Sequence, residues 1–161
     1  MNYDRDNETA ALLDVWSNAF AWPLRTIYQE DGRVYLRRFT LAERPDGGRL
    51  YLHHFVNGDS DSDLHNHPWC GSGVILAGGY HEYRLNGSTV EKCDYHPGDS
   101  THLLPETFHR VTLLRPDVGC WTLFEVGPRV GTWHFLDLAS GKMTPWRDRL
   151  AERGIPVTEY K

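Results

Sequence analysis

The arrangement of the histidines is the clearest indication of chemical function in this sequence. The chain has nine histidines, and imidazole is the most common metal ligand among side chains. Two of them, His65 and His67, are separated only by Asn66. If this segment is a β-strand, His65 and His67 share one face while Asn66 points away. A third imidazole, from His109 on a facing strand, would complete a facial metal site with open positions for substrate.

The elements that must position these histidines are predicted to be short β-strands. Runs rich in Val, Leu, Tyr, Phe, Trp and Thr are separated by clusters of Gly, Pro, Asp and Asn, a pattern typical of a sandwich or barrel. The turn Asn86-Gly87 indicates a hairpin, since both residues tolerate the positive φ of a type I′ turn. We expect strands over residues 25–29, 34–41, 50–56, 73–77, 80–85, 89–95, 100–104, 109–114, 120–126 and 132–136.

Two short helices are expected at the ends of this all-β chain. Residues 145–153 begin with a proline and are followed by Gly154, as is typical of a helix start and end. The sequence shows no repeat or linker, so we expect one domain over residues 1–161. The first helix is predicted over residues 8–19 and should pack against one end of a sheet. Its apolar residues at helical spacing are Ala11, Leu12, Val15, Trp16 and Ala19.

The composition excludes several classes of partner. The chain has a formal net charge of −5 and no stripe rich in Lys and Arg, which argues against nucleic acid or an anionic membrane. No apolar run approaches the length of a signal-peptide core or a membrane span, so we expect a soluble cytoplasmic protein. The three cysteines, Cys70, Cys93 and Cys120, include no Cys-x-x-Cys pair, so neither a disulfide framework nor a zinc ribbon is predicted.

The His-x-His segment also fits the first motif of the cupin superfamily, G-x5-H-x-H-x3,4-E-x6-G. His65 and His67 fill its two His positions, and a glycine of the pair Gly78-Gly79 falls on the closing Gly. The usual Glu of the motif falls on Gly71 or Ser72, so the carboxylate ligand is missing.

The second cupin motif, G-x5-P-x-G-x2-H-x3-N, is similar to the stretch from Gly98 to His109 in its total spacing. The resemblance covers residues 50–126. It implies a double-stranded β-helix, or jelly roll, in which His65, His67 and His109 project into the barrel. Cupins often pair through sheet edges, so the resemblance also implies a homodimer. The His-x-His-Pro-Trp segment is similar to that of small bacterial and phage cupins.

The missing carboxylate has a chemical consequence. Three neutral imidazoles leave a divalent metal its double positive charge, so a thiolate, enolate or carboxylate substrate can bind it directly. Thiol dioxygenases are cupins that hold ferrous iron with three histidines, and this chain resembles them, including the stretch Phe108-His109-Arg110-Val111. The resemblance implies Fe(II), although zinc, nickel or manganese would fit the same ligands. No organic cofactor is implied.

A further histidine, a glutamate and one of four arginines are candidates for catalytic roles. His102 lies on the strand before His109 and could move protons or act as a fourth ligand. Glu125 is a carboxylate in the apolar strand over residues 120–126, and it could replace the missing Glu if its face is the barrel interior. An arginine could clamp a substrate carboxylate through its planar fork. The arginines considered are Arg110, Arg38, Arg84 and Arg129.

Two other residues border the predicted site. Cys70, three residues after His67, could reach the metal as a thiolate, although a buried inert thiol is the more common fate of a cysteine. His54 lies on the strand that leads into His65, and this strand usually borders the cupin pocket.

The sequence predicts a metal-dependent enzyme, first a non-haem iron oxygenase acting on a small anionic molecule such as a thiol or carboxylate. A second possibility is a metal-dependent isomerase, lyase or hydrolase in which His102 or Glu125 moves protons. A third is a cupin that binds a small ligand without catalysis.

Overall fold

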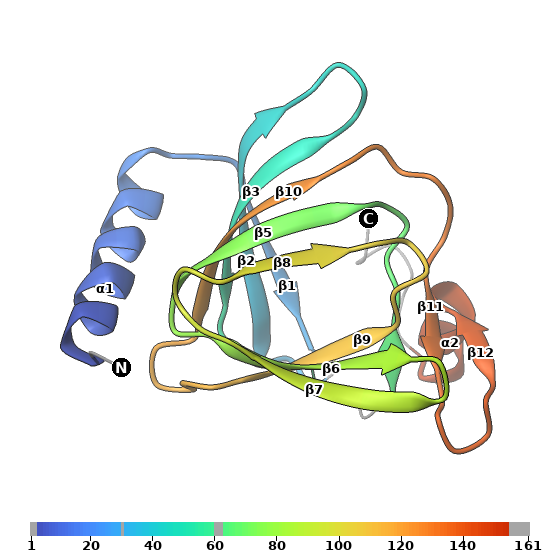
Figure 1. The fold of residues 1–161 in the computed structure, drawn as a ribbon. Coiled ribbons are helices and arrows are strands. Elements are labelled where there is room, and N and C mark those ends of the chain that lie inside the picture. The colour runs from blue at the N-terminus through green and yellow to red at the C-terminus, as the bar shows by residue number, and fades with distance from the viewer. Residues whose placement is uncertain (1–2, 30, 60–62, 155–161) are drawn as a thin grey trace.

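The computed structural model describes residues 3–29, 31–59 and 63–154, and two antiparallel β-sheets dominate them. Sheet A has the strand order β1-β2-β3-β10-β5-β8, and sheet B has the order β12-β11-β4-β9-β6-β7. The two sheets face each other, with α1 beside sheet A and α2 beside β11 and β12 (Figure 1). The elements are α1 (Tyr3–Ala19), β1 (Leu24–Tyr28), β2 (Val34–Glu43), β3 (Arg49–Phe55), β4 (Leu64–His65), β5 (Gly71–Ala77), β6 (Tyr80–Asn86), β7 (Thr89–Tyr95), β8 (Ser100–Leu103), β9 (His109–Leu113), β10 (Cys120–Val126), β11 (His134–Leu136), β12 (Met143–Pro145) and α2 (Trp146–Glu152).

The predicted all-β architecture with two terminal helices is confirmed. All ten expected strands are observed, and their ends shift by up to two residues. Two very short strands, β4 and β12, were not expected. The first of them matters for the site, because β4 ends at His65 and leaves His67 in the following segment, so the two histidines do not share one strand.

An apolar cluster joins the two sheets. Ile75 and Cys120 from sheet A pack with Tyr80 and Val111 from sheet B, and all four are at most 6% exposed. Close to this cluster the chain turns at Gly78, where φ is +76° and an added Cβ would lie 1.8 Å from the carbonyl oxygen of Gly119. The glycine is therefore required by both backbone conformation and close approach.

The first helix covers the outer face of sheet A, but with a different face from the one predicted. Leu12, Val15 and Trp16 are more than half exposed. Leu13 instead packs against the buried apolar cluster on the outer face of sheet A. The side chain of Asp6 explains this rotation, because its Oδ1 is buried and accepts the backbone N–H of Gly78 at 2.8 Å. In the described residues, neither helix combines the length and the apolar character needed to cross a bilayer.

Candidate metal centre

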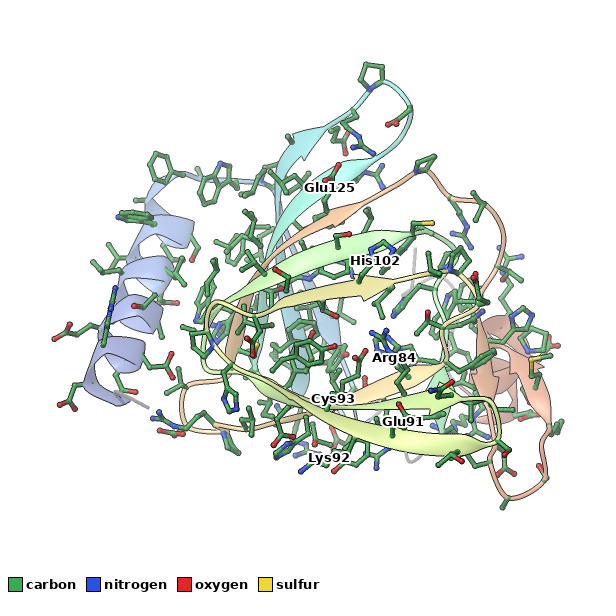
Figure 2. All side chains as sticks on the ribbon, in the orientation of Figure 1. Arg84, Glu91, Lys92, Cys93, His102 and Glu125 are labelled. Carbon is green, nitrogen blue, oxygen red and sulfur yellow. The ribbon has the colours of Figure 1, made fainter. Side chains whose placement is uncertain are left out.

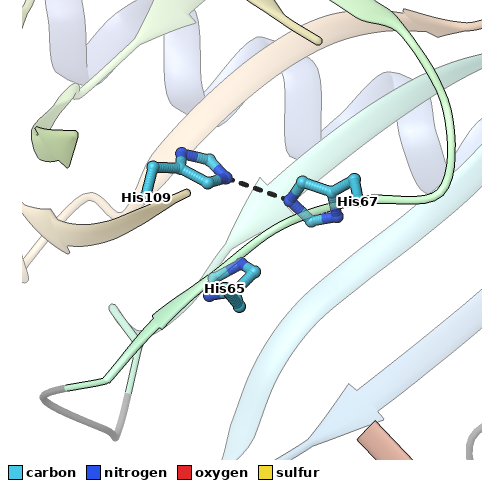
Figure 3. Close-up of side chains that lie close together, drawn as sticks. All are labelled: His65, His67 and His109. Carbon is cyan, nitrogen blue, oxygen red and sulfur yellow. Dashed lines mark hydrogen bonds between the residues drawn. The ribbon is translucent and has the colours of Figure 1, made fainter. Parts of the chain in front are cut away.

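His65, His67 and His109 gather in one cluster between the sheets (Figure 3). His65 on β4 is the direct antiparallel partner of His109 on β9, and His67 follows two residues after His65. One possible ligand atom from each imidazole lies within 4.8 Å of the other two. The Nε2 atoms of His67 and His109 are 3.0 Å apart. The predicted convergence of the three histidines is therefore present in the structure.

Asn66 sets the direction of the two histidines beside it. Its amide nitrogen donates to the carbonyl of Pro105 at 2.8 Å, and its Oδ1 accepts the backbone N–H of His134 at 2.7 Å. The Asn66 side chain is buried and faces away from the cluster. Alternation thus continues for two residues beyond the end of β4, which is why His65 and His67 stay on the same side.

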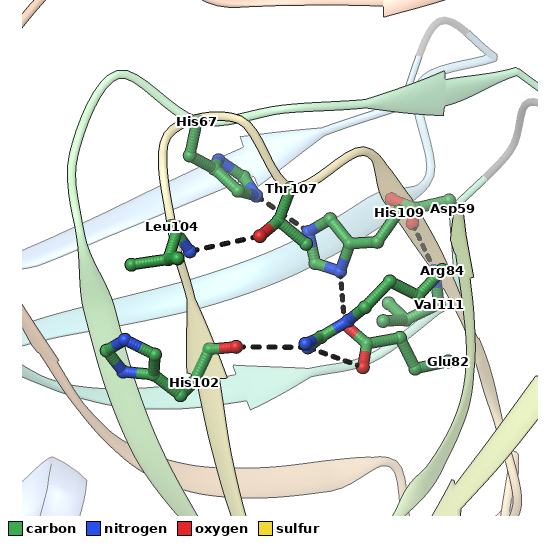
Figure 4. Close-up of polar contacts among 9 residues, drawn as sticks. All are labelled: Asp59, His67, Glu82, Arg84, His102, Leu104, Thr107, His109 and Val111. Carbon is green, nitrogen blue, oxygen red and sulfur yellow. Dashed lines mark hydrogen bonds and ion pairs between the residues drawn. The ribbon is translucent and has the colours of Figure 1, made fainter. Parts of the chain in front are cut away.

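A buried carboxylate orients His109. Glu82 on β6 is 1% exposed, and its Oε1 lies 2.6 Å from Nδ1 of His109. Because an ionised carboxylate only accepts hydrogen bonds, Nδ1 of His109 carries the proton and Nε2 presents its lone pair to the cluster. Arg84 completes the network by donating from Nη2 to Glu82 at 2.9 Å and to the carbonyl of His102 at 3.0 Å (Figure 4).

The surroundings shift the pKa values of His67 and Glu82. Burial lowers the pKa of His67 well below its ordinary value, and the charges of His65, His109 and Arg38 lower it further. Burial alone would raise the pKa of Glu82, but the hydrogen bond from His109 and the charges of His109 and Arg84 bring it below its ordinary value. The neutral imidazole of His67 and the ionised carboxylate of Glu82 are therefore the favoured forms at neutral pH.

Aromatic rings hold His67 on its other side. Trp69 stacks on His67 with ring centroids 4.4 Å apart and an interplanar angle of 13°. Phe124 from β10 contacts Trp69 edge-on at 5.8 Å, and His53 from β3 stacks on Phe124 at 5.7 Å. These rings form a continuous wall along the inner face of sheet A, leading away from the histidine cluster.

Glu125 does not face the interior, which is the condition on which its predicted role as a ligand depends. Phe124, its neighbour on β10, belongs to the inner wall, so Glu125 projects from the opposite face. Its side chain is 51% exposed and forms an ion pair with Arg44. Glu125 therefore does not replace the missing carboxylate ligand.

His102 also lies outside the cluster. On β8 the neighbours Thr101 and Leu103 are buried, whereas His102 is exposed, and its Nδ1 lies 2.7 Å from the hydroxyl of Ser72. Only its backbone carbonyl reaches the Glu82 network (Figure 4). Figure 2 shows His102 on β8 and Glu125 on β10, both strands of sheet A, with Arg84 between the two sheets. A proton-transfer role for the His102 side chain has no support in this placement.

The four arginines considered as clamps occupy different environments. Arg110 follows His109 on β9 and therefore points to the outer face, where its guanidinium carbon lies 4.0 Å from the ring centroid of Tyr83; its assignment as a clamp is wrong. Arg129 is exposed, and its Nε donates to the carbonyl of Gly131. Arg84 is bonded to Glu82, as described above, and Arg38 on β2 shares the inner face of sheet A with its cross-strand partner His53.

Cys70 and His54, the two other residues expected to border the site, also lie outside the histidine cluster. Cys70 is exposed and is not part of the metal-ligating group found among the described residues. His54 stacks on Trp121 at 4.0 Å on the outer face of sheet A, so its neighbour His53 is the histidine of β3 that faces inward.

Glu82 and His53 are the site residues that sequence reasoning missed. Glu82 lies two positions before Arg84 in the strand predicted over residues 80–85, so opposite charges share one face there. That pairing was the available signal. For His53 no such signal exists, because His53 and His54 are adjacent and only the packing decides which one faces inward.

No protein-family model matches this chain, and no curated protein matches its sequence. Solved structures do match. The chain is similar to Fe(II) HppE with a TM-score of 0.54 and 12% identity, covering 66% of this chain and 57% of HppE. It is similar to a DMSP lyase structure with a TM-score of 0.52 and 18% identity, covering 68% and 58% of the two chains.

A third similar structure is HEPD from Streptomyces albus, with 2-hydroxyethylphosphonate and Fe(II) bound. Its TM-score is 0.53 at 13% identity, and the match covers 86% of this chain but 28% of HEPD. This chain thus spans less than two thirds of each of the three proteins. At these identities the likeness concerns the fold alone, and it confirms the predicted jelly-roll fold.

Proposed function

We propose that this cupin-fold chain is a metal-dependent enzyme, a non-haem iron oxygenase that acts on a small anionic molecule. The observation that carries the proposal is the convergence of His65, His67 and His109, with possible ligand atoms within 4.8 Å of one another. Glu82 supports it, because a carboxylate behind a histidine is the usual outer partner of a metal ligand.

The donor set fits a first-row divalent metal. Three imidazole nitrogens are borderline ligands that suit iron, zinc, nickel and copper. We place Fe(II) first because HppE and HEPD, which share this fold, are described with Fe(II). A ferrous ion held by His65, His67 and His109 would supply a redox-active Lewis acid with open positions for an anionic substrate.

The chain's own residues prepare this centre before any ligand arrives. Glu82 holds the proton of His109 on Nδ1, at 2.6 Å, so Nε2 needs no rearrangement to donate its lone pair. Trp69 fixes the plane of the His67 ring and covers one side of it, excluding water there. Such preorganisation lowers the cost of binding and of orienting a substrate.

The test is metal analysis of protein purified without a chelator or a His-tag. We expect near-stoichiometric iron in the unmodified chain and its loss in a His65→Ala, His109→Ala double variant. His81→Ala is the matched control, since His81 pairs with Asp94 and lies outside the cluster, and it should keep its iron. Oxygen-uptake assays with small thiols and acids then follow. An absence of metal in all three proteins, even after reconstitution, would refute the proposal and leave a ligand-binding cupin.

The second candidate is a non-redox enzyme, an isomerase, lyase or hydrolase using the metal as a Lewis acid. The similarity to the DMSP lyases favours it. It predicts zinc, nickel or manganese in the purified protein and turnover without oxygen, so the same metal analysis and an anaerobic assay separate the two candidates.

A further inference from the structure

Arg38 is a partly buried cation with no carboxylate partner among the described residues. Its Nε donates to Nε2 of His53 at 3.2 Å, and its guanidinium carbon lies 5.0 Å from the ring centroid of Tyr51. The two terminal nitrogens make no hydrogen bond in the described part of the chain, yet they are not sealed from solvent. A desolvated charge without a counter-charge is costly, so this guanidinium is suited to receive an anion.

A second arginine stands directly opposite the first. Arg25 on β1 is the cross-strand partner of Arg38 on β2, is partly buried and forms no ion pair within the residues that the structure describes. Like charges placed directly opposite on a sheet destabilise it. Glu43, further along β2, is already paired with Arg49 at 2.9 Å. Among the residues that the structure describes, neither positive charge thus has a carboxylate partner.

The arginine pair and the histidine cluster lie along one inner surface. His53 bonds to Arg38 and stacks on Phe124, Phe124 contacts Trp69, and Trp69 stacks on His67. Arg38 and the histidine cluster are thus the two ends of one row of contacting side chains.

We propose that Arg38 and Arg25 form a subsite for a doubly charged oxyanion, a phosphate or phosphonate group at the end of the substrate remote from the metal centre. The inference rests on the proposed function, because it takes the histidine cluster as the other anchoring point of the substrate. Two opposed guanidinium groups match two negative charges, and their planar forks match the oxygens of such a group.

The test uses the full chain after chelator treatment, with methyl phosphate as the probe and titration calorimetry as the readout. At about pH 8 a phosphate monoester carries two charges, since its second pKa is roughly 6. Methyl sulfate, with one charge and the same shape, is the matched control ligand. We expect methyl phosphate to bind about tenfold or more tightly than methyl sulfate.

Variants locate the binding. Arg38→Met should weaken methyl phosphate binding by about tenfold or more, because charge-assisted hydrogen bonds are lost. Arg25→Met, on the edge strand, should weaken it as well and serves if Arg38→Met fails to fold. Arg110→Met, on the outer face over Tyr83, should bind like the unmodified chain. Equal binding by all three variants, or equal binding of the two probes, would overturn the inference.

The test of the anion subsite can fail or succeed independently of the test of the metal site. The His65→Ala, His109→Ala double variant should keep its affinity for methyl phosphate, because the probe is tested without metal. If iron never binds but Arg38→Met still loses the probe, the oxygenase proposal fails and the anion subsite stands. If iron binds and the probe does not, the reverse holds.

Discussion

Replacing Glu82 by Gln tests whether the buried carboxylate sets up the metal centre. The substitution keeps the shape of the side chain and one acceptor oxygen for Nδ1 of His109, which lies 2.6 Å away, but it removes the charge. Outer-sphere partners of metal-bound histidines typically contribute 10–100-fold to affinity. We therefore expect a metal affinity roughly 10–100-fold lower in Glu82→Gln, or about 1.4–2.7 kcal/mol.

The cost to stability can be worked from the same contacts. A hydrogen bond to a charged group contributes about 1.5–3 kcal/mol and a neutral one about 0.5–1.5 kcal/mol, so neutralising Glu82 costs about 1 kcal/mol at the His109 bond. The Arg84 bond adds less, because the arginine side chain is 33% exposed and solvent screens its charge. The free energy of unfolding of Glu82→Gln should fall by about 1–2 kcal/mol.

Two assays follow these quantities separately. Competition with a chromophoric chelator measures metal affinity, and urea unfolding of the metal-free chain measures stability. Glu91→Gln is the control, since Glu91 on β7 is exposed and bonds only to the amide of Asn86 in the described residues; Figure 2 marks its position. If Glu82→Gln and Glu91→Gln hold metal as tightly as the unmodified chain, Glu82 is not the orienting partner of His109, and the reasoning is refuted.

Three further outcomes follow from the structure. The free energy of unfolding should fall as the pH drops below about 6.5, the ordinary pKa of histidine. Burial holds the pKa values of His53 and His67 well below that value, so between the two values only the unfolded chain takes up protons at these histidines. In urea unfolding, a His53→Gln, His67→Gln variant should show a free energy of unfolding that depends less on pH. Asn66→Ala should cost about 1–3 kcal/mol in the same assay and weaken metal binding, since two buried hydrogen bonds are lost. Gly78→Ala should lower the thermal midpoint far more than Gly87→Ala; φ is positive at both, but an added Cβ meets a neighbouring oxygen only at the first.

Much of the fold could be predicted because local chemistry decides it. Turns separate the strands, so the predicted strands over residues 89–95 and 120–126 match β7 and β10 at both ends. The predicted Asn86-Gly87 turn is displaced by one residue: Asn86 ends β6 without a positive φ, and Gly87 and Ser88 form the turn. The histidine cluster was accessible for the same reason. Strict alternation places His65 and His67 on one side of the chain, whatever the length of the strand that carries them.

The inner and outer faces of sheet A could not be told apart from the sequence. Both faces are apolar, because α1 covers the outer one, where Trp121 is 1% exposed. Alternation along β10 groups Trp121 with Glu125 and sets Phe124 apart, but it does not say which group faces sheet B. The role given to Glu125 depended on that choice.

One misassignment was avoidable. Arg110 is adjacent to His109 on a strand, so an inward-facing His109 requires an outward-facing Arg110. By the same rule, Glu82 and Arg84 lie on one face of β6. The alternation of side chains along a strand thus predicts which residues face inward when one inward-facing residue is already known. Without such a residue, alternation does not tell the two faces apart.

The shortness of β4 has a consequence for the life of the protein in a cell. β4 is two residues long and pairs with β9 only through His65 and His109, so the β11, β12 and α2 portion joins the rest of sheet B through a narrow seam. Weakly joined units open locally, and proteases act on the open form. A metal ion bridging this seam would suppress that opening by mass action. We expect the metal-free chain to be degraded faster, so that its abundance follows the supply of metal.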